Sequence, residues 1–219
     1  RHRYEVNIKY KGDFEKKGQE ESDSSGFVNP VPDNSPLLDG AKQIFLIAPE
    51  TGRVLLNKDG DQIIVPSSMT KIATLMYLFD QLDKGQVTLD DTFMVSVNAW
   101  RKEGSRMFLE PNSSVKVLDL IRGIVVQSGN DATTTVAEGV AGDERQFASQ
   151  VTEMLARLGL KSTNFTNASG LPDKNHYSTA RDLALMATHL IRLYPRYYHF
   201  FSEKSYTYNN IRQQNQRTY

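Results

Sequence analysis

The sequence contains no cysteine, and this absence removes several classes of site at once. Without thiols the chain has no disulfide framework, no cysteine nucleophile and no thiolate metal ligand. It has only four histidines, and their spacing matches no metal-binding motif. We therefore expect no structural zinc and no other resident metal. The four histidines are His2, His176, His189 and His199.

Long hydrophobic runs and net charge are missing as well. No window approaches about 18 uninterrupted apolar residues, and the first ten residues, RHRYEVNIKY, do not contain the hydrophobic stretch of a signal peptide. The chain is therefore either cytosolic or the mature part of an exported protein. Its 26 basic and 26 acidic residues balance, so nothing favours a nucleic acid or an anionic membrane surface as a partner.

Residues 1–40 differ in composition from the rest of the chain. The first part is highly charged, and the segment VNPVPDNSPLLDG after it carries three of the eight prolines. We expect an N-terminal extension and linker here, followed by a folded domain over residues 41–219. With 39% hydrophobic residues among 219, the chain can bury a sizeable core.

Apolar spacing and turn signals divide the folded part into expected elements. QIFLIA and VLLN flank the turn PETGR, which predicts a β-hairpin. Thr179 and Asp182 form a helix-start signal, and Pro195 is a stop signal for the same helix. Strand-like alternation returns in the tail after Ser202. The helices expected beyond the first one lie at 114–126, 131–141, 144–160 and 178–195.

The segment PSSMTKIATLMY predicts an earlier helix with one buried face. Its apolar residues recur at the three- and four-residue spacing of a helical stripe. They are Met69, Ile72, Ala73, Met76 and Tyr77.

Ser68 and Lys71 lie three positions apart at the start of this helix and so share a face. A serine hydroxyl is a weak nucleophile until a base takes its proton. A lysine serves as that base where burial or nearby positive charge makes its neutral form accessible. Free amides at a helix N-terminus can help to hold a developing oxyanion. The alternative interpretation is structural, because serine is a favoured N-cap and the spacing occurs often by chance.

Ser128 and Asn130 flank a glycine in the segment QSGNDA, between two expected helices. The glycine allows a tight turn, so both side chains can point into one cleft. That arrangement suits a hydroxyl that relays a proton and an amide that holds a substrate peptide bond. A solvent-facing turn is the alternative interpretation of the tripeptide taken by itself.

These motifs stand in segments that closely resemble one protein family. PSSMTK, GSRMFLEPNSSVKVLDLIRGIVVQSGNDA and NASGLPDKNHYSTARDLALMATHLI resemble the serine D-alanyl-D-alanine carboxypeptidases of peptidase S11 type, the low-molecular-mass penicillin-binding proteins. S-x-x-K and an S-x-N element are signatures of the wider penicillin-binding and β-lactamase group. The resemblance extends from about residue 41 to about residue 216, roughly four-fifths of the chain.

The resemblance implies an α/β (α+β) fold of the β-lactamase and transpeptidase type, with an antiparallel sheet, a helical subdomain and a cleft between them. Ser68 would be the acylated nucleophile and Lys71 its base. Ser128 would relay the proton to the leaving D-alanine, and Asn130 would bind the substrate backbone. The implied reaction removes the terminal D-alanine of a peptidoglycan stem peptide without a cofactor. Penicillin and other β-lactam antibiotics would acylate the same serine.

The family also implies export to the periplasm or cell envelope, because its substrate lies outside the inner membrane. Membrane attachment in the family often comes from a C-terminal amphipathic helix. Any such peripheral anchor would lie beyond Tyr219.

The third motif of the family is missing. Neither Lys-Thr-Gly nor Lys-Ser-Gly follows Asn130 before the sequence ends at Tyr219. In the family this motif lies on a core strand, and its lysine helps to bind the substrate carboxylate. We expect a truncation before that strand. A clipped fragment, a truncated gene product and a scaffold that has lost the chemistry all fit the sequence.

Three other functions stay open. A serine β-lactamase shares the first two motifs, but residues 165–182 resemble the carboxypeptidase pattern rather than the glutamate-containing loop of those enzymes. A D,D-endopeptidase of the same fold differs in access to the cleft, which the sequence does not show. A non-catalytic protein would use the incomplete cleft to recognise cell-wall peptide.

Two single residues carry structural predictions. Asn112 follows Pro111 where family members often have glycine, and asparagine tolerates the left-handed conformation that a turn there requires. His176 is expected to be a loop histidine rather than a base.

Overall fold

The computed structural model describes residues 40–215. The extension expected over residues 1–40 lies outside the described residues apart from Gly40, and so do residues 216–219. Within the described part, helices are interspersed with strands that pair as four separate two-stranded antiparallel sheets.

Strands β1 (Ile44–Ile47) and β2 (Val54–Lys58) form the antiparallel hairpin that the sequence predicts. Gly52 in the connecting turn has a φ of 74°, a conformation that glycine adopts without steric cost. Its amide donates to the carbonyl of Ala48 at 2.8 Å, which closes the turn.

Helix α8 (Ala180–Leu193) packs on β1. The hydroxyl of Thr179 accepts a hydrogen bond from the amide of Asp182 at 3.0 Å, so the predicted helix-start signal is confirmed. The helix ends shortly before Pro195, as predicted.

Helix α3 (Thr70–Asp83) follows directly after a 3₁₀ turn, η1 (Ser67–Met69). The predicted single buried face is only partly right. Ala73 and Met76 are fully buried, but Met69 is 43% exposed because it belongs to the 3₁₀ turn. The helix is buried on other sides too, because it packs against three further helices. Its other buried apolar residues are Leu75, Leu78 and Phe79.

The helix expected over residues 114–126 begins later than predicted. Strand β5 (Ser114–Lys116) pairs with β4 (Thr92–Met94), and α5 spans Val117–Gln127. Val115 is 1% exposed while its two neighbours face solvent, so the local pattern has the two-residue period of a strand. The prediction of helix is therefore wrong for these first three residues.

Helices α4 (Val97–Trp100), α6 (Asn130–Ala141) and α7 (Glu144–Arg157) complete the helical part. The last two confirm the helices expected over 131–141 and 144–160, although α7 ends earlier than predicted. Both pack against α3.

The tail folds back as a second hairpin. After the 3₁₀ segment η2 (Pro195–Ser202), strand β7 (Ser205–Tyr208) pairs with β8 (Ile211–Gln214), which confirms the strand-like alternation. Asn209 and Asn210 both have positive φ, 46° and 62°, as a tight two-residue hairpin turn requires.

A two-residue strand pair links distant parts of the chain. Strand β3 (Ile63–Ile64) pairs with β6 (Ser178–Thr179), which ties the segment before η1 to the start of α8. Asn112 has a φ of 63°, so the predicted left-handed turn residue is confirmed.

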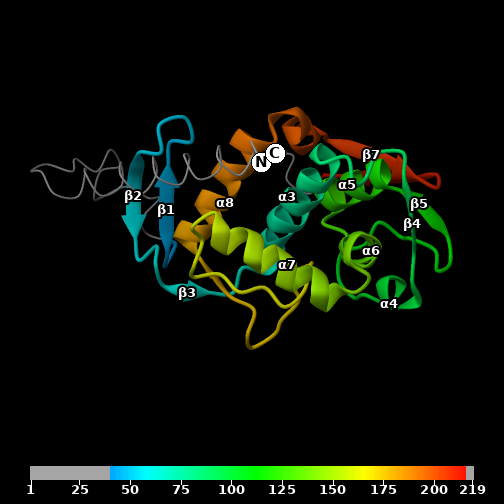
Figure 1. Ribbon diagram of the computed structural model, residues 1–219, viewed down its shortest axis with the longest axis horizontal. Helices are drawn as coiled ribbons and strands as arrows, with labels where there is room; N and C mark the ends of the chain where they lie inside the picture. The colour runs from blue at the N-terminus through cyan, green and yellow to red at the C-terminus, as the bar shows by residue number, and fades with distance from the viewer. Residues whose placement is uncertain (1–39, 216–219) are drawn as a thin grey trace, which may run out of the picture.

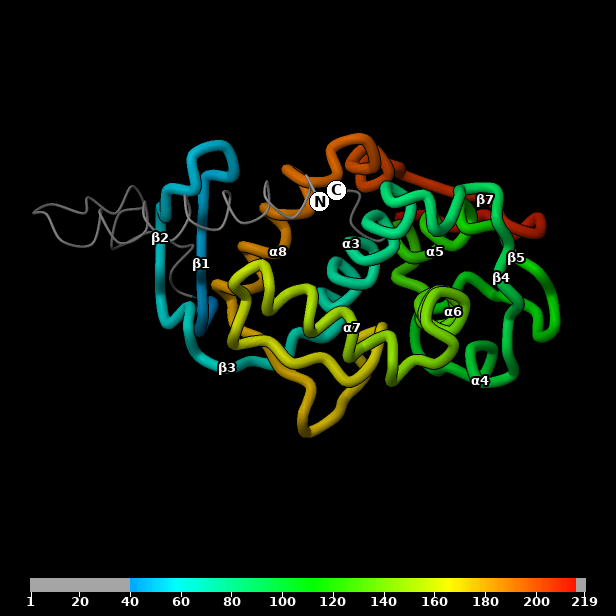
Figure 2. The backbone as a smooth tube through the Cα atoms, in the orientation of Figure 1, coloured from blue at the N-terminus to red at the C-terminus, as the bar shows by residue number. Residues whose placement is uncertain are grey.

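Helix α3 runs through the middle of the described structure (Figure 1). The hairpin β1–β2 and α8 lie at one end, while α4, α5 and α6 lie at the other. The backbone trace in Figure 2 shows the long connection between α7 and α8, in yellow, passing beside the start of α3. This connection is hydrogen-bonded to α3 through the carbonyls of Ala168 and Ser169. No helix among residues 40–215 has the length and apolar character needed to cross a membrane.

Candidate active site

Ser68 and Lys71 lie where η1 passes into α3. The ammonium nitrogen of Lys71 is 3.4 Å from Oγ of Ser68, a long hydrogen bond. Ser68 is exposed, whereas the side chain of Lys71 is almost wholly buried at 5% exposure. The expected pair is therefore in contact, with the hydroxyl facing outward and the amine beneath it.

The backbone before Ser68 has an unusual conformation. Ser67 has a φ of 49°, in the left-handed region that residues with a Cβ rarely occupy. Gly170, with a φ of 86°, packs directly against it. A Cβ on Gly170 would lie 1.8 Å from the carbonyl oxygen of Ser67. The position of Ser68 thus depends on close backbone approach at a distant glycine.

Two amides of the turn are already engaged. The amide of Met69 donates to the carbonyl of Pro66 at 3.1 Å, and the amide of Thr70 donates to carbonyls within η1. The oxyanion role that the sequence suggested for helix amides therefore does not fall to these two groups.

Lys71 has two buried acceptors besides Ser68. Its Nζ donates to Oδ1 of Asn130 at 2.7 Å and to the backbone carbonyl of Ser169 at 2.9 Å. All three of these partners are uncharged. These contacts fix the position of the Lys71 amine beside the hydroxyl of Ser68.

Asn130 is the first residue of α6 and is itself held on both sides. Its Nδ2 donates to the carbonyl of Glu103 at 2.6 Å, and its backbone amide donates to the carbonyl of Ser105 at 2.7 Å. Gly104 lies between these carbonyls, where a Cβ would come within 2.9 Å of Nδ2. The segment 103–105 thus fixes which way the amide points.

Ser128 caps the C-terminus of α5 in the left-handed conformation, with φ 57° and ψ 37°. Its hydroxyl oxygen is buried and has no hydrogen-bond partner among residues 40–215. A buried hydroxyl without a partner loses the free energy of its hydration. Ser128 lines the same cavity as Ser68 and Lys71.

The cavity has a volume of about 290 Å³. One side is formed by α3 and α5, and the other by the end of η2 and the tail, which sequence reasoning did not assign to the site. The tail residues carry no motif, and only folding brings them beside Ser68. Those that line the cavity are Phe201, Ser202, Glu203, Lys204 and Asn215.

An ion pair holds this second wall against α5. Nε of Arg122 donates to both carboxylate oxygens of Glu203, at 3.0 and 3.2 Å. The guanidinium also lies over the ring of Tyr206, whose hydroxyl donates to Asp119 at 2.7 Å. Burial and the neighbouring Asp119 carboxylate raise the pKa of Tyr206, so the phenol stays protonated.

His176 lies in a loop, as expected, and it is not among the residues that line the cavity. The amide of Thr166 donates to its Nδ1 at 3.1 Å, so Nε2 carries the proton and donates to the hydroxyl of Thr70 at 2.8 Å. Its ring stacks on Phe165, and burial lowers its pKa. His176 thus supports the first residue of α3.

Three of the four expected residues, Ser68, Lys71 and Ser128, line one cavity, and Asn130 contacts Lys71 from outside its lining. Ser68, Lys71 and Asn130 form a continuous hydrogen-bonded row, and Ser128 lies beside it. The sequence did not indicate the carbonyls of Ser169 and Glu103, because backbone acceptors carry no residue signature. No group of three or more histidine, aspartate or glutamate side chains within residues 40–215 is placed to hold a metal ion.

Comparison with known proteins assigns the chain to a family. The family model for peptidase S11, D-alanyl-D-alanine carboxypeptidase, matches residues 34–219. The chain belongs to the peptidase S11 family. The resemblance seen in the motifs is therefore confirmed.

Relatives agree with this assignment. The chain is 40% identical over 158 residues to the D-alanyl-D-alanine carboxypeptidase DacF of Bacillus subtilis, which is 72% of this chain and 41% of that protein. It is 38% identical over 178 residues to the D-alanyl-D-alanine carboxypeptidase DacA of Haemophilus influenzae, which is 80% of this chain and 45% of that protein. The peptidase S11 chain thus spans less than half the length of these two relatives.

A solved structure confirms the expected fold class. Penicillin-binding protein 5 of Haemophilus influenzae superposes with a TM-score of 0.77 at 38% identity, covering 80% of this chain and 52% of that one. Mixed helices and antiparallel strands in this arrangement are the penicillin-binding and β-lactamase-like fold.

Proposed function

We propose that the chain acts as a serine D,D-carboxypeptidase, which removes the terminal D-alanine of peptidoglycan stem peptides through an acyl-enzyme on Ser68. The observation that carries the proposal is the row from Ser68 through buried Lys71 to Asn130 at the edge of a cavity. Membership of a family of D-alanyl-D-alanine carboxypeptidases supports it.

Acylation follows from these positions. The neutral amine of Lys71 takes the proton of the Ser68 hydroxyl, and Oγ attacks the carbonyl carbon of the penultimate D-alanine. The tetrahedral intermediate collapses with cleavage of the peptide bond, and the leaving nitrogen takes up a proton through the hydroxyl of Ser128. Free D-alanine departs, and the peptide remains as an ester on Ser68.

Deacylation returns the enzyme to its starting state. A water molecule attacks the ester carbonyl while Lys71 accepts its proton, and Ser68 leaves as the restored hydroxyl. Throughout, Asn130 binds the substrate backbone, and its contact with Lys71 fixes the amine beneath Ser68. No cofactor takes part in either step.

β-Lactam antibiotics are the second class of ligand in this proposal. Attack of Ser68 on the lactam carbonyl opens the four-membered ring, and the amine stays attached to the acyl group. Because no fragment departs, hydrolysis is slow and the adduct accumulates. The penicillin-binding name of the relative with a solved structure supports this part of the proposal.

The substrate also sets the place of action. Peptidoglycan lies outside the inner membrane, so the protein works after export, in the periplasm or cell envelope. Nucleic acid has no part in this function, since the 26 basic and 26 acidic residues balance.

Release of D-alanine from a peptide that ends in D-Ala-D-Ala tests the proposal, with Ser68→Ala as the control. D-alanine release by the wild type alone supports it. Faster cleavage of a cross-linked peptide dimer would show an endopeptidase instead. Rapid turnover of a β-lactam would show a β-lactamase. Peptide binding without any cleavage would show a non-catalytic protein.

A further inference from the structure

We infer that the ion pair between Lys102 and Glu144 is a positioning device for the active site, an inference that rests on the proposed function. Neither residue lines the cavity. The pair acts on Lys71 and Asn130 through two segments of backbone.

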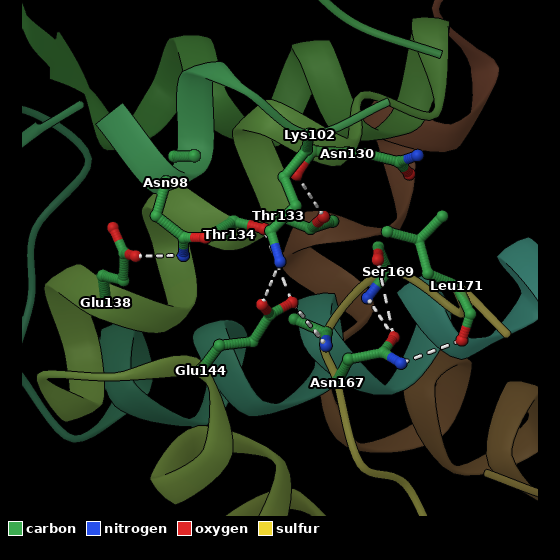
Figure 3. Close-up of polar contacts among 12 residues, drawn as sticks. Asn98, Lys102, Asn130, Thr133, Thr134, Glu138, Glu144, Asn167, Ser169 and Leu171 are labelled. Atoms are coloured by element: carbon green, nitrogen blue, oxygen red, sulfur yellow. Dashed lines mark hydrogen bonds and ion pairs between the residues drawn. The ribbon is translucent and has the colours of Figure 1, made fainter. Parts of the chain in front are cut away.

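The contact is close and partly buried. Nζ of Lys102 lies 2.5 Å from Oε2 of Glu144, and the two side chains are 19% and 14% exposed. Oε1 of Glu144 accepts two further hydrogen bonds, from the hydroxyl of Thr134 at 3.4 Å and from the amide of Ala168 at 3.2 Å. Figure 3 shows Glu144 at the centre of these contacts, between Lys102 and the segment that contains Asn167 and Ser169.

On one side the pair reaches the carbonyl that accepts from Lys71. Glu144 holds the amide of Ala168, and the next residue, Ser169, presents its carbonyl to Nζ of Lys71 at 2.9 Å. The carbonyl of Ala168 accepts from the hydroxyl of Thr74 on α3 at 2.7 Å. Glu144 therefore helps to fix the position of Ala168 and Ser169 relative to α3.

On the other side the pair reaches the carbonyl that orients Asn130. The residue after Lys102 is Glu103, whose carbonyl accepts from Nδ2 of Asn130 at 2.6 Å. Ser105, two residues further, accepts from the amide of Asn130 at 2.7 Å. Lys102 is thus one residue from the carbonyl of Glu103, which orients Asn130. The amide that Glu144 binds is one residue from the carbonyl of Ser169, which accepts from Lys71.

Neither segment belongs to a helix or a strand, so no backbone ladder fixes it. Catalysis is sensitive to misplacement, since a shift of about 1 Å can lower a rate by about 10²-fold. Removing one member of a partly buried pair leaves the other charge without its partner. Loss of either Lys102 or Glu144 should therefore move the carbonyls of Glu103 and Ser169.

A neighbouring contact offers a matched control. Nδ2 of Asn98 donates to Oε1 of Glu138 at 2.8 Å and also joins α4 to α6. Figure 3 shows this contact on the opposite side of Lys102 and Glu144 from Asn167 and Ser169. Glu138→Gln removes a carboxylate from the same helix as Thr134 without touching the inferred device.

The first measurement is the rate of acylation by a fluorescent penicillin, with the full chain and its variants. Lys102→Met and Glu144→Gln should each lower the acylation rate by roughly 10- to 100-fold. Lys102→Arg, which keeps the charge, should stay within about 3-fold of the wild type, and so should Glu138→Gln. A purely electrostatic effect on Lys71 would act in opposite directions in the two charge-removing variants, and that outcome would overturn the inference.

The second measurement is hydrogen exchange, which does not depend on activity. The inference predicts faster exchange of the amides in 103–105 and 167–170 in Lys102→Met and Glu144→Gln, with α5 unchanged. If a single variant does not fold, the neutral double variant Lys102→Met/Glu144→Gln replaces it, with the same expected exchange. Unchanged exchange in these segments would overturn the inference. A wild type that is not acylated would refute the proposed function but not the inference about the ion pair. The exchange measurement would still decide whether the ion pair positions the two segments.

Discussion

Nζ of Lys71 donates a hydrogen bond of 2.7 Å to Oδ1 of Asn130, although 59 positions separate the two residues in the sequence. The same amine lies 3.4 Å from Oγ of Ser68. The shorter contact indicates that Asn130 and the carbonyl of Ser169 define where the amine sits. Ser68 then approaches an amine whose position is already fixed.

Replacement of Asn130 tests this relationship. Asn130→Ala removes the acceptor for Lys71 and the donor to Glu103, so we expect the rate of acylation by penicillin to fall by roughly 10²-fold. Asn164→Ala, which removes a side-chain amide elsewhere in the chain, should leave the rate unchanged. An Asn130→Ala rate close to that of the wild type would mean that Lys71 does not need this contact.

Gly170 provides a prediction about stability. Gly170→Ala places a Cβ 1.8 Å from the carbonyl oxygen of Ser67, so the backbone before Ser68 must move. Gly142→Ala is the matched control, because Gly142 has nearly the same φ, 87° against 86°, and no atom within 4 Å of the built Cβ.

We expect Gly142→Ala to lower the free energy of unfolding by about 1–3 kcal/mol, the cost of the backbone conformation alone. Gly170→Ala should lower it by a further 1–3 kcal/mol, roughly, because of the overlap. Urea unfolding of both variants measures the difference. Equal losses would show that Gly170 is needed only for its φ.

His189 predicts how stability depends on pH. Burial and, next, the charge of Arg192 lower its pKa to about 4. In the unfolded chain a histidine has a pKa of about 6.5, so the unfolded state binds the proton more readily than the folded state does. The free energy of unfolding therefore rises with pH over this range. This contribution is complete above about pH 6.5. It is lost as the pH falls toward about 4, by a total on the order of 3 kcal/mol.

Urea unfolding between pH 4 and pH 7 checks the prediction. His189→Gln should flatten this part of the curve, whereas His199→Gln, at an exposed position, should retain the wild-type slope. A His189→Gln curve that still falls as steeply as that of the wild type would place the titration elsewhere.

Periodicity and spacing predicted much of the fold because the signals are local. The first hairpin, the Thr179 cap of α8 and the buried positions Ala73 and Met76 all follow from residues within a few places of one another. The prediction failed at Ser114–Lys116, where a strand of three residues is too short to interrupt the apolar pattern of the following helix.

The site was predictable only where a side chain carries the chemistry. Ser68, Lys71, Ser128 and Asn130 are recognisable by residue type and spacing. In the structure the first three line one cavity, and Asn130 is hydrogen-bonded to Lys71. The carbonyl of Ser169 could not be found in this way, because every residue has a carbonyl and only long-range folding selects this one. The cavity wall formed by the tail depends on folding in the same way.

The intact mass of the denatured chain after incubation with penicillin tests the central claim, that Ser68 is the nucleophile that forms the acyl-enzyme. We predict one covalent adduct on the wild type, one on Ser67→Ala, whose hydroxyl belongs to the adjacent serine, and none on Ser68→Ala. A folded wild type without an adduct, or an adduct that persists in Ser68→Ala, would contradict the account.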